Sequence, residues 1–417
     1  MHCYFNRLLK EFIMKYLRHS DSHNHTFKMI FLIMAICFTS ACRDKTPEVE
    51  LPHEVPPVEV DPKPKEELHP VSDMVLIYAG GAHRNVTWNR QYLKPYVTFT
   101  DEDGTEHWLF DGFLFLEFIT GNSQLSTSRI FAFGYGSLPA RKQEWKELAD
   151  YYFTPNNAVY ALEAAIAEAA ARIGNPEKKV KVVICLPQPI PAGQGSRYPS
   201  VPAGYWGDIN GKTLNFSNKA DRIAACSWFI DYVSELFHKG NFKYAELSGF
   251  YWIAESIDET GDMLPDMADV LNRRKYTFNW IPCWKNSATP DFFTWKNHKF
   301  TYAYLQPNYF FSDLPLSRLS QACEYANKYD LNLEFEFDHN VLSAFGRTKV
   351  YRMYDYMDAF RNKNMLDTKK IAYYQGTDVL AQLYFSKDTD DNELYGEFCS
   401  FVLEHQTLHK LNRESSK

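Results

Sequence analysis

The sequence predicts one α/β domain, a closed (β/α)8 TIM-type barrel, preceded by a disordered N-terminal lipoprotein linker. Three observations support this prediction. Apolar runs of strand length recur eight times between residues 74 and 378, and helix-like runs separate most of them. No G-x-G-x-x-G follows the first run, which speaks against an open nucleotide-binding sheet, the alternative fold. Apolar strands that alternate with helices form parallel sheets, and eight such strands close into a barrel.

The N-terminal segment has the pattern of an export signal. Residues 29–38 are a short apolar run after Lys28, and the small residues of "TSAC" end at Cys42. The run is too short to span a bilayer, and the pattern is typical of a bacterial lipoprotein signal. We expect 1–41 to be the signal peptide, with Cys42 lipidated and anchored in the outer membrane, facing the periplasm or the cell surface. An uncleaved N-terminal anchor is the alternative.

The remaining chain divides into a linker and a barrel domain. Residues 42–72 are rich in Pro and Glu and predict an extended linker without a core of its own. Residues 73–417 are expected to form the barrel, as a monomer. Its predicted strands are 74–80, 112–120, 180–190, 245–256, 276–284, 300–310, 331–338 and 370–378. Its predicted helices are 141–152, 157–174, 219–238, 264–273, 315–329, 350–362 and 391–405.

Two connections carry turn signals. Residues 96–110 read as a hairpin with Asp103-Gly104 in its turn, and the long Gly- and Pro-rich loop 191–218 contains a second Asn-Gly turn at 210–211. The long loop follows the third strand on the face where barrel enzymes bind their substrates, so we expect it to cover a substrate.

Charge and cysteine usage exclude two classes of function. The net charge is −7, and removing residues 1–41 leaves 40 basic and 50 acidic residues, a net charge of −10. This balance does not suit a nucleic-acid-binding surface. The five cysteines after Cys42 show no zinc-ligand spacing and are expected to be buried thiols. We therefore expect no metal and no cofactor.

Acidic residues at the ends of two strands indicate an active site. In "LNLEFEFDHN", residues 331–340, three acids at every second position share one face of a strand: Glu334, Glu336 and Asp338. Glu255 ends the fourth strand, and catalytic groups of barrels lie at the C-terminal strand ends. Two carboxylates across such a mouth, about 5–5.5 Å apart for retention or about 6.5–9.5 Å for inversion, are the groups that hydrolyse glycosides. The alternative for each acid is an interior ion pair.

Within this set, Glu255 and Glu336 are the expected catalytic pair. Asp338 is a candidate to replace Glu336, and Glu334 lies deeper, as a structural or tuning carboxylate. Tyr251 and Trp252 predict an apolar setting for Glu255, which favours the role of the acid.

Aromatic and polar residues near the strand ends are candidates for sugar binding, with core packing as the alternative for the aromatic ones. The expected platforms are Trp252, Trp284, Tyr304, Tyr309, Tyr374 and Trp206. The expected hydroxyl-binding groups are Gln188, Gln306, Asn308 and Gln375. Arg84, in the first loop, would suit a uronate or a sulfated sugar, although exposure to solvent is its alternative.

These acids also carry a family resemblance. "GFYWIAES" and the strand-seven acids resemble the family known as domain of unknown function 4855, which is described as glycosidase-like, and the arrangement resembles the clan of retaining (β/α)8 glycosidases. The leader, linker and aromatic-rich barrel resemble polysaccharide-utilisation proteins of gut Bacteroides. The resemblance implies that Glu255 is the acid/base and Glu336 the nucleophile. The clan has Asn before the first acid, whereas this sequence has Ala254, so a non-catalytic glycan-binding lipoprotein stays open as an alternative.

Overall fold

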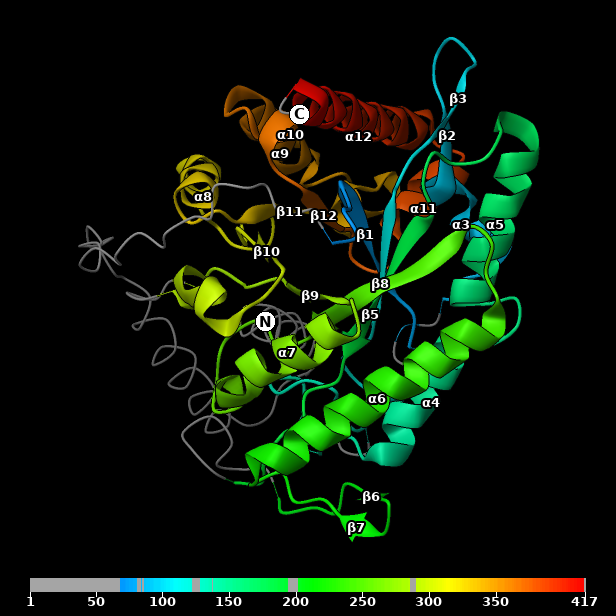
Figure 1. Ribbon diagram of the computed structural model, residues 1–417. Helices are drawn as coiled ribbons and strands as arrows, with labels where there is room; N and C mark the ends of the chain where they lie inside the picture. Colours follow the sequence, from blue (N-terminus) through cyan, green and yellow to red (C-terminus); the bar gives the residue numbers. More distant parts are fainter. Residues whose placement is uncertain are drawn as a thin grey trace, which may run out of the picture. The chain divides into compact units, whose positions relative to one another are not determined.

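The computed structural model describes residues 68–415, except 81–83, 85, 122–127, 137, 194–201 and 286–289. Within it, eight parallel strands close into a barrel in the order β1-β12-β11-β10-β9-β8-β5-β4 (Figure 1). The strands are β1 (Asp73–Tyr78), β4 (Gly112–Leu116), β5 (Val180–Leu186), β8 (Ala245–Trp252), β9 (Thr277–Trp280), β10 (Tyr302–Leu305), β11 (Asn332–Glu336) and β12 (Ile371–Tyr374). The predicted barrel and its eight strands are confirmed. The predicted signal peptide, almost all of the linker, and Cys42 lie outside the described residues.

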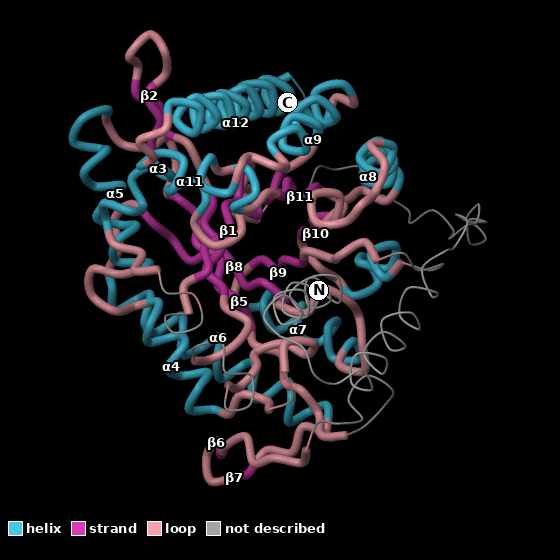
Figure 2. Tube along the Cα trace, turned by 180° about the vertical axis from the view of Figure 1, so that it is seen from behind, coloured by secondary structure: helices cyan, strands magenta, loops and turns pink. Residues whose placement is uncertain are grey.

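Helices surround the strands, as Figure 2 shows. They are α3 (Arg90–Val97), α4 (Lys142–Tyr152), α5 (Ala158–Ile173), α6 (Lys219–Gly240), α7 (Leu264–Arg273), α8 (Ser317–Lys328), α9 (Val350–Asn362), α10 (Met365–Thr368), α11 (Val379–Phe385) and α12 (Thr389–Ser415). Short 3-10 turns are η1 (Gly261–Met263), η2 (Asp291–His298), η3 (His339–Val341) and η4 (Ser343–Phe345). None of the helices in the described part of the chain combines the length and the hydropathy needed to cross a membrane.

Both predicted hairpins are present, and one is shorter than expected. β2 (Thr98–Thr100) pairs with β3 (Glu106–Trp108), and β6 (Asp208–Ile209) pairs with β7 (Lys212–Thr213). The residues just before β2 belong to α3, which the sequence did not reveal. This helix begins where the Asn89 side chain accepts a hydrogen bond from the Tyr92 amide, and Pro95 within it had argued against a helix.

The packing of β11 fixes the direction of its acidic residues. The Phe335 ring contacts Tyr356 and Phe360 of α9, and it also contacts Phe398 and Phe401 of α12. Phe335 therefore faces the helix layer. Because side chains alternate along a strand, Glu334 and Glu336 point the other way, toward the barrel axis.

Buried polar groups join the first strand to the C-terminal helix. The backbone amides of Ser72 and Asp73 donate to Asp111, which precedes β4. The Asp73 carboxylate accepts from Tyr373 of β12 at 2.6 Å and lies 2.7 Å from the His405 ring of α12. These contacts connect β1, β4, β12 and α12 at the N-terminal end of the barrel strands.

Candidate active site

Three glutamates from two strand ends form one electrostatic cluster. Glu334 and Glu336 lie on β11, the seventh barrel strand, and Glu255 follows the end of β8, the fourth. After burial itself, the charges of Glu336 and Glu255 are the causes that raise the pKa of Glu334. The ends of β8 and β11 therefore contribute to the same site.

Glu336 is fully buried, and the pKa of its carboxyl is raised. Burial raises the pKa of its carboxyl to about 7. The Tyr356 hydroxyl of α9 donates to Oε2, and this bond, with the amides of Asn308 and Tyr309, partly offsets the rise. Near neutral pH the carboxyl is thus present in both protonation states, which is the condition for a general acid and base.

The surroundings of Glu334 favour its neutral form. Its side chain is 1% exposed, and Oε2 has no hydrogen-bond partner among the described residues. Burial, then Glu336 and Glu255, hold its pKa well above the ordinary value for glutamate. Since the protonated group carries no charge, it adds no net repulsion to the cluster.

Glu255 is the most accessible of the three, because it is only half-buried. The Tyr135 hydroxyl donates to its Oε1 at 3.4 Å, and the Tyr135 ring stacks on Phe118 with centroids 4.0 Å apart. The Cys283 amide donates to the Glu255 carbonyl at 3.0 Å, which fixes the backbone. Of the two expected catalytic carboxyls, Glu336 is the fully buried one, whereas Glu255 is half-buried beside Tyr135 and Tyr251, and its role as the acid stays a prediction.

Asp338 begins a short helical turn. Its Oδ1 accepts from the backbone amide of Asn340 at 2.8 Å and from the Asn340 side chain at 2.6 Å. These bonds give Asp338 the role of a cap for η3. The structure shows no corresponding cap at Glu336.

Aromatic rings line the site next to the glutamates. Tyr374, which pairs in register with Glu336, meets Tyr78 edge-on at 5.9 Å and Phe311 at 5.5 Å. Tyr78 also contacts Phe118, which carries the Tyr135 ring. Of these, the sequence analysis proposed only Tyr374. Tyr78 ends β1, so the strand-end criterion applied elsewhere would have found it.

Four of the proposed sugar platforms belong to the core instead. Trp252 and Tyr304 are each 1% exposed, Trp206 is 4% exposed and Trp284 is 7% exposed. The Arg318 guanidinium covers Trp284 with Cζ 3.2 Å from the ring centroid. With no free ring face, these side chains cannot stack a sugar without rearrangement of the core. A fifth, Tyr309, is also buried, and its hydroxyl donates to Asp355 at 2.6 Å.

The proposed polar residues divide into two pairs. Gln188 donates to Asp258 at 2.7 Å and accepts from the Phe133 amide at 2.9 Å, so it joins two loops. Gln375 accepts from Tyr96 and from the Leu380 amide, both at 2.9 Å. These two amides serve the fold.

Gln306 and Asn308 remain beside the catalytic candidates. Both are half-buried, and both contribute hydrogen bonding that lowers the pKa of Glu336. Asn308 adopts the left-handed conformation, with φ of 56°. Their position agrees with a role in reading hydroxyl groups.

Arg84 also reaches the site. Its Cζ lies 3.3 Å from the centroid of the Tyr78 ring, and the residue is half-buried. The solvent-exposed alternative for Arg84 is therefore wrong. Within the described residues, no three His, Cys, Asp or Glu side chains gather as metal ligands.

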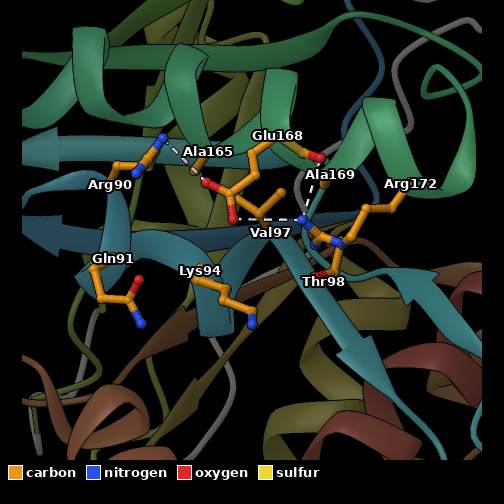
Figure 3. A pocket seen from close by; sticks show the side chains of 9 residues that line it. All are labelled: Arg90, Gln91, Lys94, Val97, Thr98, Ala165, Glu168, Ala169 and Arg172. Carbon is orange, nitrogen blue, oxygen red and sulfur yellow. Dashed lines mark hydrogen bonds and ion pairs between the residues drawn. The ribbon is translucent and has the colours of Figure 1, made fainter.

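Two cavities lie outside this cluster. The one in Figure 3 is a crevice between α3 and α5, where Glu168 pairs with Arg90 at 3.2 Å and with Arg172 at 3.4 Å. The other is lined by the end of α6 and the start of β8. Because ion pairs fill the first and the second is at the N-terminal strand ends, we assign both to stability.

Comparison with known proteins identifies a family for this chain. The sequence model of the family described as "Domain of unknown function (DUF4855)" matches residues 73–400. None of the curated proteins matches the chain.

Similar solved structures are distant from this chain in sequence. A mutant tryptophan synthase alpha-subunit from Pyrococcus furiosus is 7% identical, with 80% of this chain and 97% of that chain covered and a TM-score of 0.33. A GH18 chitinase from the chitin utilization locus of Flavobacterium johnsoniae is 10% identical, with coverages of 79% and 94% and a TM-score of 0.36. A GH113 beta-1,4-mannanase is 12% identical, with coverages of 81% and 98% and a TM-score of 0.36. We infer no function from these likenesses.

Proposed function

The chain belongs to the family described as domain of unknown function (DUF4855), and we propose that it is a glycoside hydrolase that acts on a poly- or oligosaccharide. One observation carries the proposal. Carboxylates from the ends of the fourth and seventh strands form one cluster, in which Glu336 is buried with a pKa of about 7 and Glu255 is accessible. Two carboxyl groups in unlike settings can divide the roles of proton donor and nucleophile.

The settings assign the roles. Glu336 donates its proton to the glycosidic oxygen as the bond to the anomeric carbon breaks. Glu255 attacks that carbon and forms a covalent glycosyl ester. A water molecule then attacks the ester, the Glu336 carboxylate takes its proton, and Glu255 leaves as a carboxylate, so the configuration is retained. The family resemblance implies the opposite roles, with Glu255 as the acid/base and Glu336 as the nucleophile. We reverse them because the resemblance identifies only which two residues match, whereas the protonation state of each carboxyl depends on its burial.

A glycan panel with product detection tests the activity. The wild-type protein is expected to release sugars from at least one poly- or oligosaccharide. Glu255→Gln and Glu336→Gln should each lower kcat by a factor of at least about 10³, with unchanged thermal unfolding. Near-wild-type turnover of both variants would contradict the proposal.

Azide distinguishes the two roles on the active substrate. If Glu255 is the nucleophile, Glu255→Gly should use azide to give a glycosyl azide of inverted configuration. Glu336→Gly should still form the covalent intermediate on an activated substrate, and azide should then give the retained configuration. The opposite pairing of variants and products would restore the roles implied by the resemblance.

A second candidate function is binding without hydrolysis. Glu336 is 0% exposed, so a substrate reaches it only if the covering residues move, and Ala254 stands where the glycosidase clan has Asn. A glycan that binds without giving any product, with an affinity unchanged in Glu336→Gln, would support a non-catalytic glycan-binding lipoprotein. Release of sugar from any panel member would exclude it.

The location in the cell is part of the proposal. We propose that Cys42 is lipidated and that the linker, 42–72, holds the barrel away from the outer membrane, facing the periplasm or the surface. Expression in a Gram-negative host with labelled palmitate should give a labelled, membrane-associated protein. Cys42→Ala should remove the label, and Cys283→Ala serves as the control variant. An unlabelled wild-type protein would contradict the anchor.

A further inference from the structure

Arg84 has hydrogen-bonding capacity that the protein leaves unused. The residue follows β1, on the side of the barrel where the glutamates lie, and its guanidinium stacks on Tyr78 with Cζ 3.3 Å from the ring centroid. Its Nη1 atom is buried and has no hydrogen-bond partner among the described residues. An unpaired buried donor on a charged group is costly.

The guanidinium is positioned next to the glutamate cluster. Tyr78, beneath it, contacts Tyr374 and Phe118, both at 5.9 Å. Phe118 stacks with Tyr135, whose hydroxyl donates to Glu255. A group bound by Arg84 therefore lies beside the aromatic rings that connect Tyr78 to Glu255.

The charge of Arg84 is supported by a nearby acid, Glu117. Burial opposes that charge, whereas interactions with Tyr78, Tyr374 and Glu117 outweigh burial and raise the pKa of Arg84. Oε1 of Glu117 accepts from the Phe118 amide at 2.7 Å. Gly80 gives this carboxylate its space, because a Cβ at that position would lie 2.0 Å from Cγ of Glu117. Glu117 thus adds a favourable charge near Arg84, while Nη1, which has no partner among the described residues, can donate to another anion.

We propose that the glycan bound at this site is anionic and that Arg84 binds its carboxylate or sulfate group. The planar fork of a guanidinium matches two oxygens of either group and is pre-organised here by its stacking on Tyr78. The inference rests on the proposed function only in taking a glycan as the ligand. The competing explanation is that Arg84 only balances the negative charge of the cluster.

Matched pairs of polymers separate these explanations. The probes are glucuronoxylan and polygalacturonate before and after carboxyl reduction, and a sulfated galactan before and after desulfation, so that each pair differs only in the anionic group. Calorimetry with the purified protein is expected to show at least about tenfold tighter binding of the native member in at least one pair. Arg84→Gln should abolish that preference, and Arg84→Lys should keep only part of it, because an ammonium offers no planar fork.

The control variant is Arg90→Gln, which removes an arginine that pairs with Glu168 on the outer helices, and it should keep the wild-type preference. Thermal unfolding checks that each variant folds. Equal binding of both members of every pair, absence of binding to every anionic polymer, or a preference that survives in Arg84→Gln would each overturn the inference. If the inference is overturned but the protein hydrolyses a neutral glycan, the proposed function still holds. If the preference depends on Arg84 but no product forms, the inference about Arg84 is supported and the proposed glycoside hydrolase function is not.

Discussion

Glu334 and Glu336 share one face of one strand, yet their surroundings raise the pKa values of the two carboxyls to different extents. Tyr356 donates to Glu336, and the amides of Asn308 and Tyr309 support its charged form, which limits the pKa to about 7. Glu334 has no such support, and its pKa lies well above the ordinary value. The Tyr356 hydroxyl at Glu336, which the strand pattern does not encode, distinguishes the surroundings of the two carboxyls.

Removing the Tyr356 hydroxyl is expected to shift the pH dependence of activity. The hydroxyl stabilises the carboxylate of Glu336, so Tyr356→Phe raises the pKa of Glu336 further above about 7. Activity that needs the protonated acid is lost as pH rises through this pKa. The alkaline limb of kcat/KM should therefore move upward by about one pH unit, since a hydrogen bond to a charged group contributes about 1.5–3 kcal/mol.

The matched control is Tyr354→Phe on the same helix, where the hydroxyl donates to Glu397 instead. It should leave the profile unchanged. A downward shift of the alkaline limb in Tyr356→Phe would contradict the role of Glu336 as the acid.

Glu334 offers the opposite expectation. The surroundings of Glu334 favour a neutral carboxyl, so Glu334→Gln removes no charge at neutral pH. The glutamine amide also nearly preserves the shape of the protonated side chain. We expect kcat to change by less than about threefold, in contrast to the loss in Glu336→Gln. Steady-state kinetics of the two variants side by side provide the measurement, and equal losses would mean that Glu334 itself takes part in the chemistry.

At the level of single residues, the sequence predicted the acids better than the aromatic platforms. Alternation within one strand was enough to place Glu334 and Glu336 on one face. Deciding which face of β8 looks inward needs its register, and β8 has an irregularity next to Ser248, where Val182 and Val183 of β5 pair with Leu247 and Gly249. Such a bulge changes which residues point to the axis, so Trp252 packs on Phe278 while Tyr251 lies near Glu255.

Among the elements, the predicted strands extend too far at their C-terminal ends. The segment predicted over 245–256 forms a strand only over β8, Ala245–Trp252. Residues 253–256, which follow this strand and include Glu255, begin with apolar residues typical of a strand but form a loop. Apolar composition does not distinguish a barrel strand from a buried loop at its mouth, because both are removed from water.

The long loop after β5 depends on Trp206. Its ring lies among Trp145, Phe216 and Trp228, with centroid distances of 5.1, 5.4 and 5.8 Å. Trp206→Ala should lower the free energy of unfolding by about 3–5 kcal/mol, the usual loss for a buried large aromatic. The neighbouring Tyr205 is 54% exposed, so Tyr205→Ala should cost less than about 1 kcal/mol. Urea denaturation measures both, and similar small losses would show that the loop is not anchored by Trp206.

For the whole molecule, the count of eight strands predicted a closed barrel, but not the contacts that lock its ends together. β1 pairs with both β4 and β12, which closes the ring. Asp73 at the start of β1 bonds to His405, 332 positions away. A single sequence shows no periodic signal for a pair so far apart, so this buried network required the structure.

This network makes the stability of the barrel depend on pH. Burial, followed by the charge of Asp73, raises the pKa of Asp111 to about 6, against about 3.9 in an unfolded chain. An acid whose pKa is raised on folding contributes stability that is present below its unfolded pKa and is lost as pH rises through its folded pKa. Asp111 therefore favours the folded state below about pH 4 and loses this contribution between about pH 4 and pH 6.

His405 acts in the same direction at higher pH. Burial opposes its charge, but Asp73 outweighs burial, so the pKa of His405 is raised above its ordinary value of 6.5. Its contribution is complete below that value and is lost as pH rises further. Carboxylates with lowered pKa values act oppositely, and Glu246, with a pKa of about 2 set mainly by its hydrogen bond to His69, does so only below about pH 4. The pH range in which Glu246 acts, below about pH 4, does not overlap with the range of Asp111, between about pH 4 and pH 6.

Asp111→Asn tests the assignment, because the amide mimics the protonated acid and does not titrate. Urea denaturation measures the free energy of unfolding of the wild type at each pH. The Asp111 carboxyl should lower this free energy by about 2–3 kcal/mol between pH 4 and pH 6. In Asp111→Asn the slope in this window should be smaller by that amount, while Asp103→Asn, in the exposed turn of the β2–β3 hairpin, should keep the wild-type slope. If Asp111→Asn and the wild type had parallel profiles from pH 4 to pH 6, the carboxyl would be ionised throughout, and the buried network would not set the pH dependence of the barrel.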